Sequence, residues 1–341
     1  MLSAAEALLP LIVLGAVCAA FSYSANGLLM PLFKRYAMAR PNARSSHKEP
    51  TPQGGGAGVL LGLLAGLGAM ATAGSSHFLA PPFLALAVSA ILLALTGALD
   101  DMFSLSVRIR LIAQVAACAF ALFGICTSAP LPFGVAALVI VLPALMVGLM
   151  WFVNLTNFMD GIDGITVAEF VPMCLALAAL EAIGRVPVEG GIAAGLAGAL
   201  IGFLPFNRHV ARLFLGDLGS LWIGLIAGCL LLRLALAGYP VAAAILPLYY
   251  LADATITLIR RFRRGENVTQ AHRTHFYQRA TDLGWSVPAI TGRIWLTNAG
   301  LALLAFVSVW FNGALIQVVA LLAAAALVGW LLAAFSRPPA R

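Results

Sequence analysis

The chain has 341 residues, of which 62% are hydrophobic and only 10% are charged. Soluble domains are typically about 45–50% apolar and about 25% charged, so this composition excludes an ordinary soluble globular protein. The formal net charge is +7. Because the charges lie in short segments between apolar runs, we expect membrane lipid and not nucleic acid as the partner.

Apolar runs separated by polar breaks predict about eleven spanning helices, since each needs roughly 20 apolar residues. Their expected limits are 6–28, 54–73, 79–98, 110–128, 132–152, 165–184, 190–206, 217–236, 240–259, 293–311 and 314–335. The seventh run is short and glycine-rich, so ten spans are the alternative. Backbone groups in lipid need internal partners, and the alternation of a β-barrel is absent. We therefore expect one all-α polytopic membrane domain over 1–341.

Lysine and arginine are distributed very unevenly between the two sets of alternating loops. One set carries 18 of the 20 such residues: 31–53, 99–110, 153–164, 207–216, 260–292 with the adjoining Arg293, and the tail after Phe335. The opposite loops hold only Arg185 and Arg233. By the positive-inside rule the basic set is cytoplasmic, which places the N-terminus outside and the C-terminus inside.

Acidic residues gather on the same expected side. Five of the seven aspartates fall at cytoplasmic ends of spans: Asp100, Asp101, Asp160, Asp163 and Asp217. Carboxylates near a membrane cost free energy unless they are paired or bind a ligand, so clustering in three loops favours a shared site over a scattered solvated set. Oxygen ligands beside phosphates predict Mg²⁺, with Mn²⁺ as the alternative.

The three acidic segments differ in what their spacing predicts. Adjacent residues on a helix diverge by about 100°, so Asp100 and Asp101 cannot do the same work; one is expected to face a metal or phosphate and the other a basic partner. Asp217 opens the eighth span. It is explained equally well as a helix cap or as part of a phosphate site at a helix N-terminus.

The segment 154–164, NLTNFMDGIDG, repeats polar residues at intervals of three. Asn154 and Asn157 share a helical face, and Asp160 and Asp163 continue the spacing. The two glycines of the segment allow the helix to break and the backbone to approach a ligand closely. This pattern favours a metal and phosphate site.

A long basic loop begins at Arg260. Its first arginines are typical of an anchor to anionic lipid, and we expect Asp253, two turns earlier, to pair with Arg260 or Arg261. Later in the loop, His272, Arg273, His275 and Arg279 offer stacking and bidentate groups suited to a nucleotide diphosphate. A second basic segment, 44–56, ends in glycines but lacks the Lys-Ser/Thr ending of a P-loop.

Five segments in order resemble the polyprenyl-phosphate N-acetylhexosamine-1-phosphate transferases of glycosyltransferase family 4. They are SHKEPTPQGGG at 46–56, DD at 100–101, NLTNFMDGIDG at 154–164, FLGDLGS at 214–220 and HRTHFYQR at 272–279. The resemblance implies transfer of a sugar phosphate from a UDP-N-acetylhexosamine to undecaprenyl phosphate, with release of UMP. It also implies a bacterial inner membrane protein with a cytoplasmic site, and by itself suggests a homodimer.

The resemblance also implies roles for individual residues. Asp217 and Asn157 match metal ligands. Asp100 and Asp101 match a pair near the lipid phosphate and the diphosphate, and Asp160 and Asp163 match the aspartates of the nucleotide-proximal loop; these four are the candidate catalytic residues. The candidate substrate-binding residues are Asn154, His272, Arg273, His275, Arg279, His47 and Lys48.

One departure from the family bears on the donor. Many relatives carry a His-x-His-His run where this chain has His275-Phe276-Tyr277-Gln278. The segment looks closer to the O-antigen-initiating branch, whose donors are 6-deoxy sugars such as UDP-N-acetylfucosamine or UDP-N-acetylquinovosamine; UDP-N-acetylglucosamine is the alternative.

Two other functions compete with this one. The first is lipid I synthesis, by transfer of phospho-MurNAc-pentapeptide. The second is a non-enzymatic transporter, which predicts ionisable residues near the bilayer midplane. Glu169, Glu181 and Asp253 are the acidic residues clearly within spans, and they form no obvious relay.

Overall fold

A computed structural model describes residues 4–39, 49–73, 80–128, 134–187, 189–268, 270 and 272–339. Its elements are α1 Ala4–Tyr36, β1 Met38–Ala39, β2 Thr51–Pro52, α2 Gly55–Thr72, α3 Pro81–Phe103, α4 Val107–Ser128, α5 Val135–Met159, α6 Ile165–Ala182, α7 Gly190–Asn207, α8 Asp217–Leu236, α9 Pro240–Ile245, α10 Leu248–Arg263, α11 Phe276–Asp282, α12 Val287–Phe311 and α13 Ala314–Phe335. Ten of these described helices are long and apolar enough to cross a membrane. The all-α, multi-pass prediction is confirmed.

The segment expected as the ninth span is a helix broken in two. It forms α9 and α10, and neither piece is among the ten long apolar helices. The break lies at Leu246 and Pro247, where proline has no N–H to continue the helical hydrogen bonds. The count of ten or eleven therefore depends on this segment.

The expected weak point, the glycine-rich seventh span, is instead a full helix in the interior. A Cβ atom at Gly198 of α7 would lie 2.0 Å from the carbonyl oxygen of Gly15 on α1. The glycine is therefore needed for the close approach of the two helices, as is typical of helix packing in membranes. Glycine content here marks a contact and not a break.

Three helices form the centre of the bundle. In each of α6, α7 and α8, 78% of the residues in an apolar stretch of 18 are buried, compared with 17% in α1 and 22% in α5. Around them, α1 and α2 pack on α7, α3 and α5 on α8, and α12 on α6. Of the central helices, α6 begins directly after the 154–164 segment and α8 begins at Asp217, so two of the three acidic segments lie in the middle of one end of the bundle.

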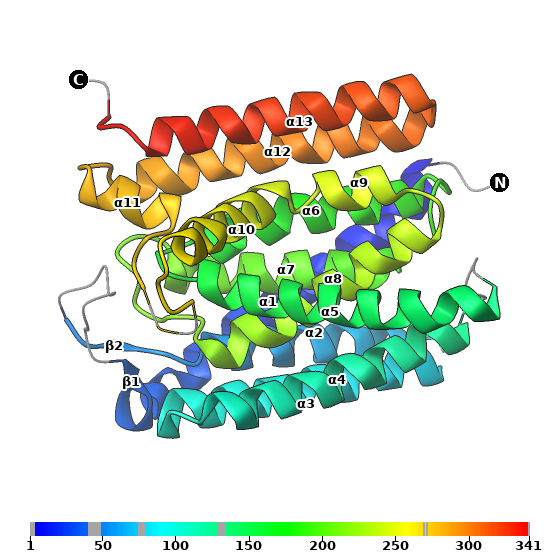
Figure 1. The fold of residues 1–341 in the computed structure, drawn as a ribbon. Helices are drawn as coiled ribbons and strands as arrows, with labels where there is room; N and C mark the ends of the chain where they lie inside the picture. Colours follow the sequence, from blue (N-terminus) through cyan, green and yellow to red (C-terminus); the bar gives the residue numbers. More distant parts are fainter. Residues whose placement is uncertain are drawn as a thin grey trace.

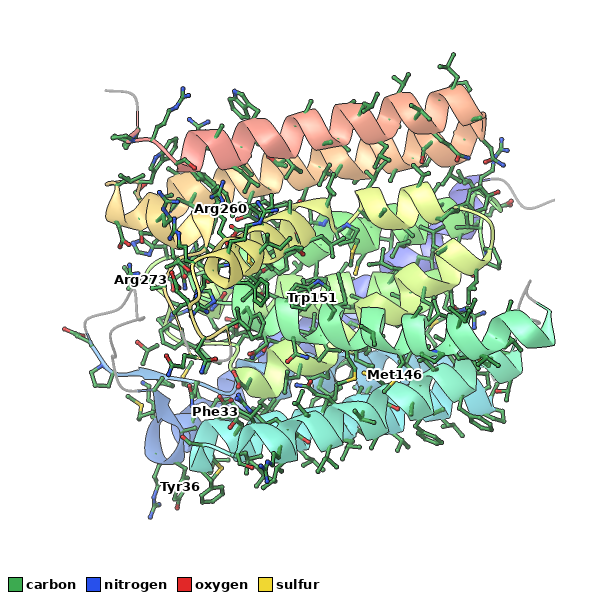
Figure 2. The ribbon with its side chains drawn as sticks, in the orientation of Figure 1. Phe33, Tyr36, Met146, Trp151, Arg260 and Arg273 are labelled. Atoms are coloured by element: carbon green, nitrogen blue, oxygen red, sulfur yellow. The ribbon has the colours of Figure 1, made fainter. Side chains whose placement is uncertain are left out.

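The two ends of the helix bundle carry different parts of the chain. The N-terminus lies at one end of the bundle, and the C-terminus lies at the other end together with β1, β2 and α11 (Figure 1). We call the second one the basic end, because α1 closes there with Lys34 and Arg35 and α10 with an arginine run. Arg260 and Arg273 lie toward this end, whereas Met146 and Trp151 lie along α5 (Figure 2).

A short extended segment links the basic end of α1 to the start of α8. β1 and β2 pair antiparallel, with Met38 opposite Pro52. Gln53 then forms a parallel bridge to Phe214, whose N–H donates to the Pro52 carbonyl at 2.8 Å. This pairing brings the TPQGGG segment against FLGDLGS, two motifs more than 150 residues apart in the chain.

The two arginines at the opposite end have partners of their own. Arg233 forms an ion pair with Glu189 and donates to Ser128 Oγ at 2.8 Å. Arg185 lies over the Trp310 ring, 4.3 Å from its centroid. Both exceptions to the charge asymmetry are thus held within the fold.

Replacing Glu189 by glutamine is expected to change how stability depends on pH. Burial raises the pKa of Glu189 from 4.5 to about 7, although Arg233 opposes the shift. The folded protein binds the Glu189 proton more tightly than the unfolded chain does. This difference in proton binding stabilises the folded state fully below pH 4.5, and the stabilisation is lost as pH rises through 7. The Glu189→Gln variant lacks this loss, so its stability relative to wild type should rise by on the order of 1–3 kcal/mol between pH 5 and 8.

Thermal unfolding in detergent at pH 5 and pH 8 measures this difference. A constant gap between wild type and variant at the two pH values would contradict the expectation.

Candidate functional site

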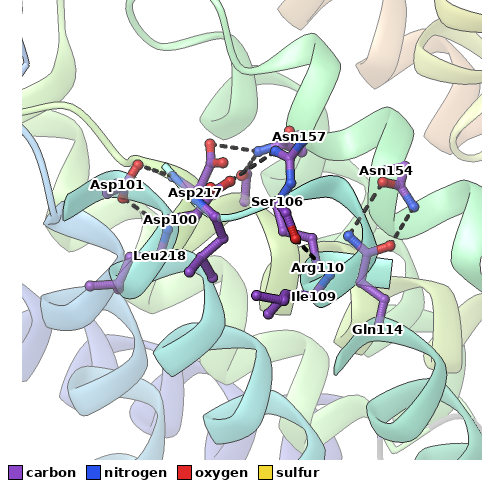
Figure 3. A network of polar contacts seen from close by, with 12 residues as sticks. Asp100, Asp101, Ser106, Ile109, Arg110, Gln114, Asn154, Asn157, Asp217 and Leu218 are labelled. Atoms are coloured by element: carbon purple, nitrogen blue, oxygen red, sulfur yellow. Dashed lines mark hydrogen bonds and ion pairs between the residues drawn. The ribbon is translucent and has the colours of Figure 1, made fainter. Parts of the chain in front are cut away.

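Asp217 and Asn157 lie side by side at the basic end. Asp217 is the first residue of α8, and Asn157 is in the last turn of α5. The Asn157 amide donates to Asp217 Oδ1 at 2.8 Å and to Ser220 Oγ at 2.9 Å (Figure 3). The structure therefore brings together the two residues predicted as metal ligands, and adds Ser220 to them.

Asp100 joins this pair from α3. Its carboxylate receives a hydrogen bond from the Leu105 N–H at 2.7 Å and forms an ion pair with Arg110 at 2.8 Å. It also interacts electrostatically with the nearby Asp217 carboxyl. The predicted basic partner of the acidic pair is thus Arg110, on the next helix.

Asp101 does different work, as the 100° divergence predicts. Its two oxygens accept hydrogen bonds from the backbone N–H groups of Asp217 at 3.2 Å and Leu218 at 3.1 Å. Asp101 therefore caps the first turn of α8 from another helix. The capping explanation for Asp217 is wrong, because the residue before α8 is Gly216, at φ +78°, and no side chain of α8 makes the cap.

Removing this cap is expected to cost stability and activity together. In an Asp101→Ala variant two N–H groups at the start of α8 lose their acceptors, so the free energy of unfolding should fall by about 1–2 kcal/mol. Asp217 sits on that turn, so turnover per folded molecule should fall too.

Thermal unfolding and transfer assays on the same samples test this. Ser286→Ala is the matched control, because Ser286 Oγ caps α12 by accepting from the Ala289 N–H. That variant should lose stability but keep its turnover. Unchanged turnover in Asp101→Ala would show that the cap does not position Asp217.

Asn154 is engaged in contacts between helices. Its amide and that of Gln114 on α4 exchange two hydrogen bonds, at 2.7 and 3.3 Å, and its nitrogen also donates to the Met150 carbonyl (Figure 3). This amide pair fastens α4 to α5 beside the site. A role for Asn154 in binding substrate stays a prediction.

Asp160 and Asp163 point in different directions from the loop between α5 and α6. Asp163 is buried and accepts from the Ala211 N–H at 3.1 Å, with His209 Nδ1 at 2.8 Å from the same oxygen. Asp160 accepts from the Thr166 hydroxyl. Burial raises the pKa of Asp160 to about 7, against the opposing effect of that hydrogen bond. Asp163 thereby ties this loop to the one before α8.

The HRTHFYQR segment reaches the same region through Tyr277. The buried Tyr277 hydroxyl donates to the Phe158 carbonyl at 3.2 Å, so α11 touches the acidic loop directly. Gln278 is also buried, and its side chain accepts from the His275 N–H at 3.3 Å. Tyr277 and Gln278, which depart from the His-x-His-His pattern, therefore make hydrogen bonds in the interior of the protein.

The other predicted substrate-binding residues are placed as follows. His275 is buried, with its ring 4.8 Å from that of His272, measured between centroids. Arg273 pairs with Asp282 at 3.2 Å, and Arg279 is exposed on α11. His47 and Lys48 lie outside the described residues.

The expected pairing of Asp253 with Arg260 or Arg261 is wrong. Arg261 pairs with Glu266 at 2.8 Å, and Arg260 lies over the Phe276 ring. Asp253 faces α11 instead, because α10 turns its buried side toward that helix.

An open cavity of about 700 Å³ adjoins the acidic loops at this end. Lys34, Thr51, His209 and Arg212 are among the residues that line it. Its wall includes the same His209 that contacts Asp163. Ligand pockets are typically about 300–1,000 Å³, so this space is large enough for a nucleotide sugar.

The cluster around Asp217 is suited to a magnesium ion. The carboxylates of Asp100 and Asp101 both lie near Asp217, and Arg110 is ion-paired with Asp100. In the part of the chain described, no group of three or more His, Cys, Asp or Glu side chains is arranged to hold a metal. Mg²⁺ commonly takes only one or two carboxylates and completes its shell with water and substrate phosphates. Asp217 and the Asn157 amide fit that mode of binding.

Several partners in this site carry no signal in the sequence. Four of them contact residues that lie 10 to 119 positions away in the chain: Arg110, Ser220, His209 and Tyr277. Ser220 and Tyr277 lie in the FLGDLGS and HRTHFYQR motifs and Arg110 lies in a basic loop, but none of these patterns indicates the partner. Helix packing decides which residues meet.

Known proteins resemble this chain over most of its length. Residues 83–235 match the model of glycosyl transferase family 4. A decaprenyl-phosphate N-acetylglucosaminephosphotransferase of Mycolicibacterium smegmatis is 28% identical, in an alignment that covers 81% of this chain and 76% of the length of that relative. A probable undecaprenyl-phosphate N-acetylglucosaminyl 1-phosphate transferase of Bacillus subtilis is 25% identical, covering 76% of this chain and 75% of its own. A phospho-N-acetylmuramoyl-pentapeptide-transferase of Heliobacterium modesticaldum is 46% identical over 21% of this chain and 22% of its own.

Proposed function

Because this chain belongs to the polyprenyl-phosphate N-acetylhexosamine-1-phosphate transferases of glycosyl transferase family 4, we propose that it transfers an N-acetylhexosamine-1-phosphate from a UDP-sugar to undecaprenyl phosphate. The products are UMP and a lipid-linked sugar diphosphate. The observation that carries the proposal is the meeting of Asp100, Asp217 and Asn157 from three helices at the basic end. Oxygen ligands clustered there favour a divalent cation, and substrate phosphates would supply the remaining ligands of Mg²⁺.

Phosphoryl transfer depends mainly on position and on neutralising charge. An oxygen of the lipid phosphate forms a bond to the sugar-bearing β-phosphorus, and the bond from that phosphorus to the bridging oxygen breaks as UMP leaves. When bound by Asp217 and Asn157, Mg²⁺ would neutralise the diphosphate. Direct attack needs little base catalysis, because a phosphate with a second pKa near 6 is largely ionised at neutral pH.

The two adjacent aspartates divide the remaining work. Both oxygens of Asp101 already accept backbone hydrogen bonds, so its role is to hold the start of α8. Asp100 faces Asp217 and forms an ion pair with Arg110. We therefore assign the orientation of the lipid phosphate, with any proton transfer, to Asp100 and Arg110. An aspartyl-phosphate route is the alternative, and rapid-quench trapping of a phosphoenzyme distinguishes the two.

The nucleotide sugar is assigned to the side of the site that carries Asp163 and the cavity. Lys34 and Arg212 supply positive charge there, and a UDP diphosphate is anionic. Because Tyr277 and Gln278 are buried, the choice of sugar falls to residues outside these two positions. The donor panel includes UDP-N-acetylglucosamine because the relatives are named for it, and the 6-deoxy sugars because the sequence resembles the O-antigen-initiating branch.

The product is assigned to the start of a surface glycan such as an O-antigen. The charge asymmetry supports a cytoplasmic site in a bacterial inner membrane. Lipid I synthesis is the second candidate function, favoured by the local 46% identity to a phospho-N-acetylmuramoyl-pentapeptide-transferase.

A donor panel tests the function. Detergent-purified protein would be given undecaprenyl phosphate, Mg²⁺ and in turn UDP-N-acetylglucosamine, UDP-N-acetylquinovosamine, UDP-N-acetylfucosamine and UDP-MurNAc-pentapeptide. UMP release and the lipid product are followed together. Mg²⁺-dependent release with one donor names the sugar. Folded protein that releases no UMP with any donor would overturn the proposal and favour transport.

A further inference from the structure

Asp253 is the most heavily hydrogen-bonded carboxylate in the described part of the chain. It lies on α10 and is fully buried. Its Oδ1 accepts from the Phe276 N–H at 3.0 Å and lies 3.1 Å from His275 Nδ1. Its Oδ2 accepts from the Tyr277 N–H at 3.3 Å. An isolated carboxylate at this depth would be costly, so these contacts are needed to hold it.

Two further donors come from the same helix as Asp253. The Thr257 hydroxyl lies 3.3 Å from Oδ1 and the Tyr249 hydroxyl 3.5 Å from Oδ2. An ionised carboxylate only accepts hydrogen bonds. With Asp253 ionised, His275 carries a proton on Nδ1, the ring nitrogen that faces the carboxylate, and Nε2 is left as the other hydrogen-bonding atom of the ring.

The geometry points to Asp253 as a positioning residue that holds His275 and the start of α11 in one orientation for the transfer reaction. This inference rests on the proposed function, because His275 belongs to the 272–279 segment, which is expected from the sequence to bind the nucleotide sugar. A carboxylate that fixes both the tautomer and the direction of an imidazole is a common arrangement around functional histidines.

The effect of Asp253 extends to the acidic loop. It binds the first two N–H groups of α11, and the second of these belongs to Tyr277. The Tyr277 hydroxyl in turn donates to the Phe158 carbonyl, next to the Asp160 loop. The His275 ring stacks on the Tyr277 ring at 5.8 Å between centroids. The buried Asp253 carboxylate thus sets the spacing between the 272–279 segment and the loop that carries Asp160.

A double-mutant cycle tests whether Asp253 acts through His275. In either orientation, the Asn amide of Asp253→Asn places its NH2 group against a backbone N–H that had donated to the carboxylate, so we expect kcat/KM to fall at least tenfold. His275→Gln should cause a loss of similar size. Because the two residues act as one unit, the double variant should lose no more than the larger single loss. Losses that multiply, or wild-type kinetics in Asp253→Asn, would overturn the inference.

Thr257→Val is the matched control, since it removes another hydrogen bond to the same carboxylate and leaves His275 and α11 untouched. It should stay within about twofold of wild type in kcat/KM. A loss as large as that of Asp253→Asn would show that packing around α10, and not His275, is responsible. Thermal unfolding of every variant confirms that folded protein is compared.

Nitrogen NMR of wild-type protein labelled with ¹⁵N-histidine gives a readout independent of activity. The chain has five histidines, and His275→Gln identifies the signal of interest. A proton on Nδ1 supports the inference, and an unprotonated Nδ1 overturns it, even where Asp253→Asn does not fold. Failure of the donor panel would leave this readout standing, so the two proposals fail separately.

Discussion

Asp217→Asn should lose nearly all transfer activity while the protein stays folded. Asp217 contacts Asn157 and faces Asp100, and it is the carboxylate assigned to the cation. Loss of a ligand that neutralises a diphosphate removes several kcal/mol of transition-state stabilisation, which corresponds to on the order of 10³-fold in rate. Initial rates of UMP release over a range of Mg²⁺ concentrations measure the loss and any shift in the metal requirement.

The same acid-to-amide change at the opposite end of the bundle is its control. Glu189→Gln alters an ion pair far from the site and should keep turnover near that of wild type at neutral pH. A variant at Asp217 that turns over within tenfold of wild type, with the same Mg²⁺ dependence, would remove Asp217 from the chemistry. Transport or lipid binding would then become the better explanation of the fold.

Gly97→Ala is expected to have the second largest effect, through packing. A Cβ atom at this position of α3 would lie 2.3 Å from the backbone oxygen of Asp217, a contact that no side chain can relieve. The start of α8 would have to move away, at a cost of about 1–3 kcal/mol in folding free energy. Because that movement also carries Asp217 away from Asn157, transfer activity should fall as well.

Gly68→Ala on α2 is the matched variant, because nothing lies within 4 Å of a Cβ added there. It should be neutral or stabilise the helix by roughly 0.5–1 kcal/mol. Thermal unfolding and transfer rates of both variants separate the two cases. Equal behaviour of Gly97→Ala and Gly68→Ala would mean that α3 and α8 do not meet as closely as the structure shows.

Much of the site could be predicted before the fold was known. Asn157 and Asp217 were expected to lie together as metal ligands, and their side chains are hydrogen-bonded, while the metal itself stays a prediction. Asp100 and Asp101 were expected to diverge, and they do. Only the divergence follows from local geometry, because helical spacing fixes how neighbouring residues point, whereas the meeting of Asn157 with Asp217 was implied by the family resemblance of their two segments. The predicted pairing of Asp253 failed because it relied on proximity along the chain, whereas a buried helix turns one face to a partner 22 or more residues away.

The sequence by itself determined the all-α membrane fold, the approximate limits of the helices and the end of the bundle that carries the candidate site. These follow from the length of apolar runs and from the placement of charge, which are local properties that the bilayer reads directly. Only the tertiary structure decided that Asp101 caps α8, that Asp253 holds α11 and that the ninth span is broken. Buried polar groups take whichever partners helix packing brings within hydrogen-bonding distance, and that choice is made across the bundle and not along the chain.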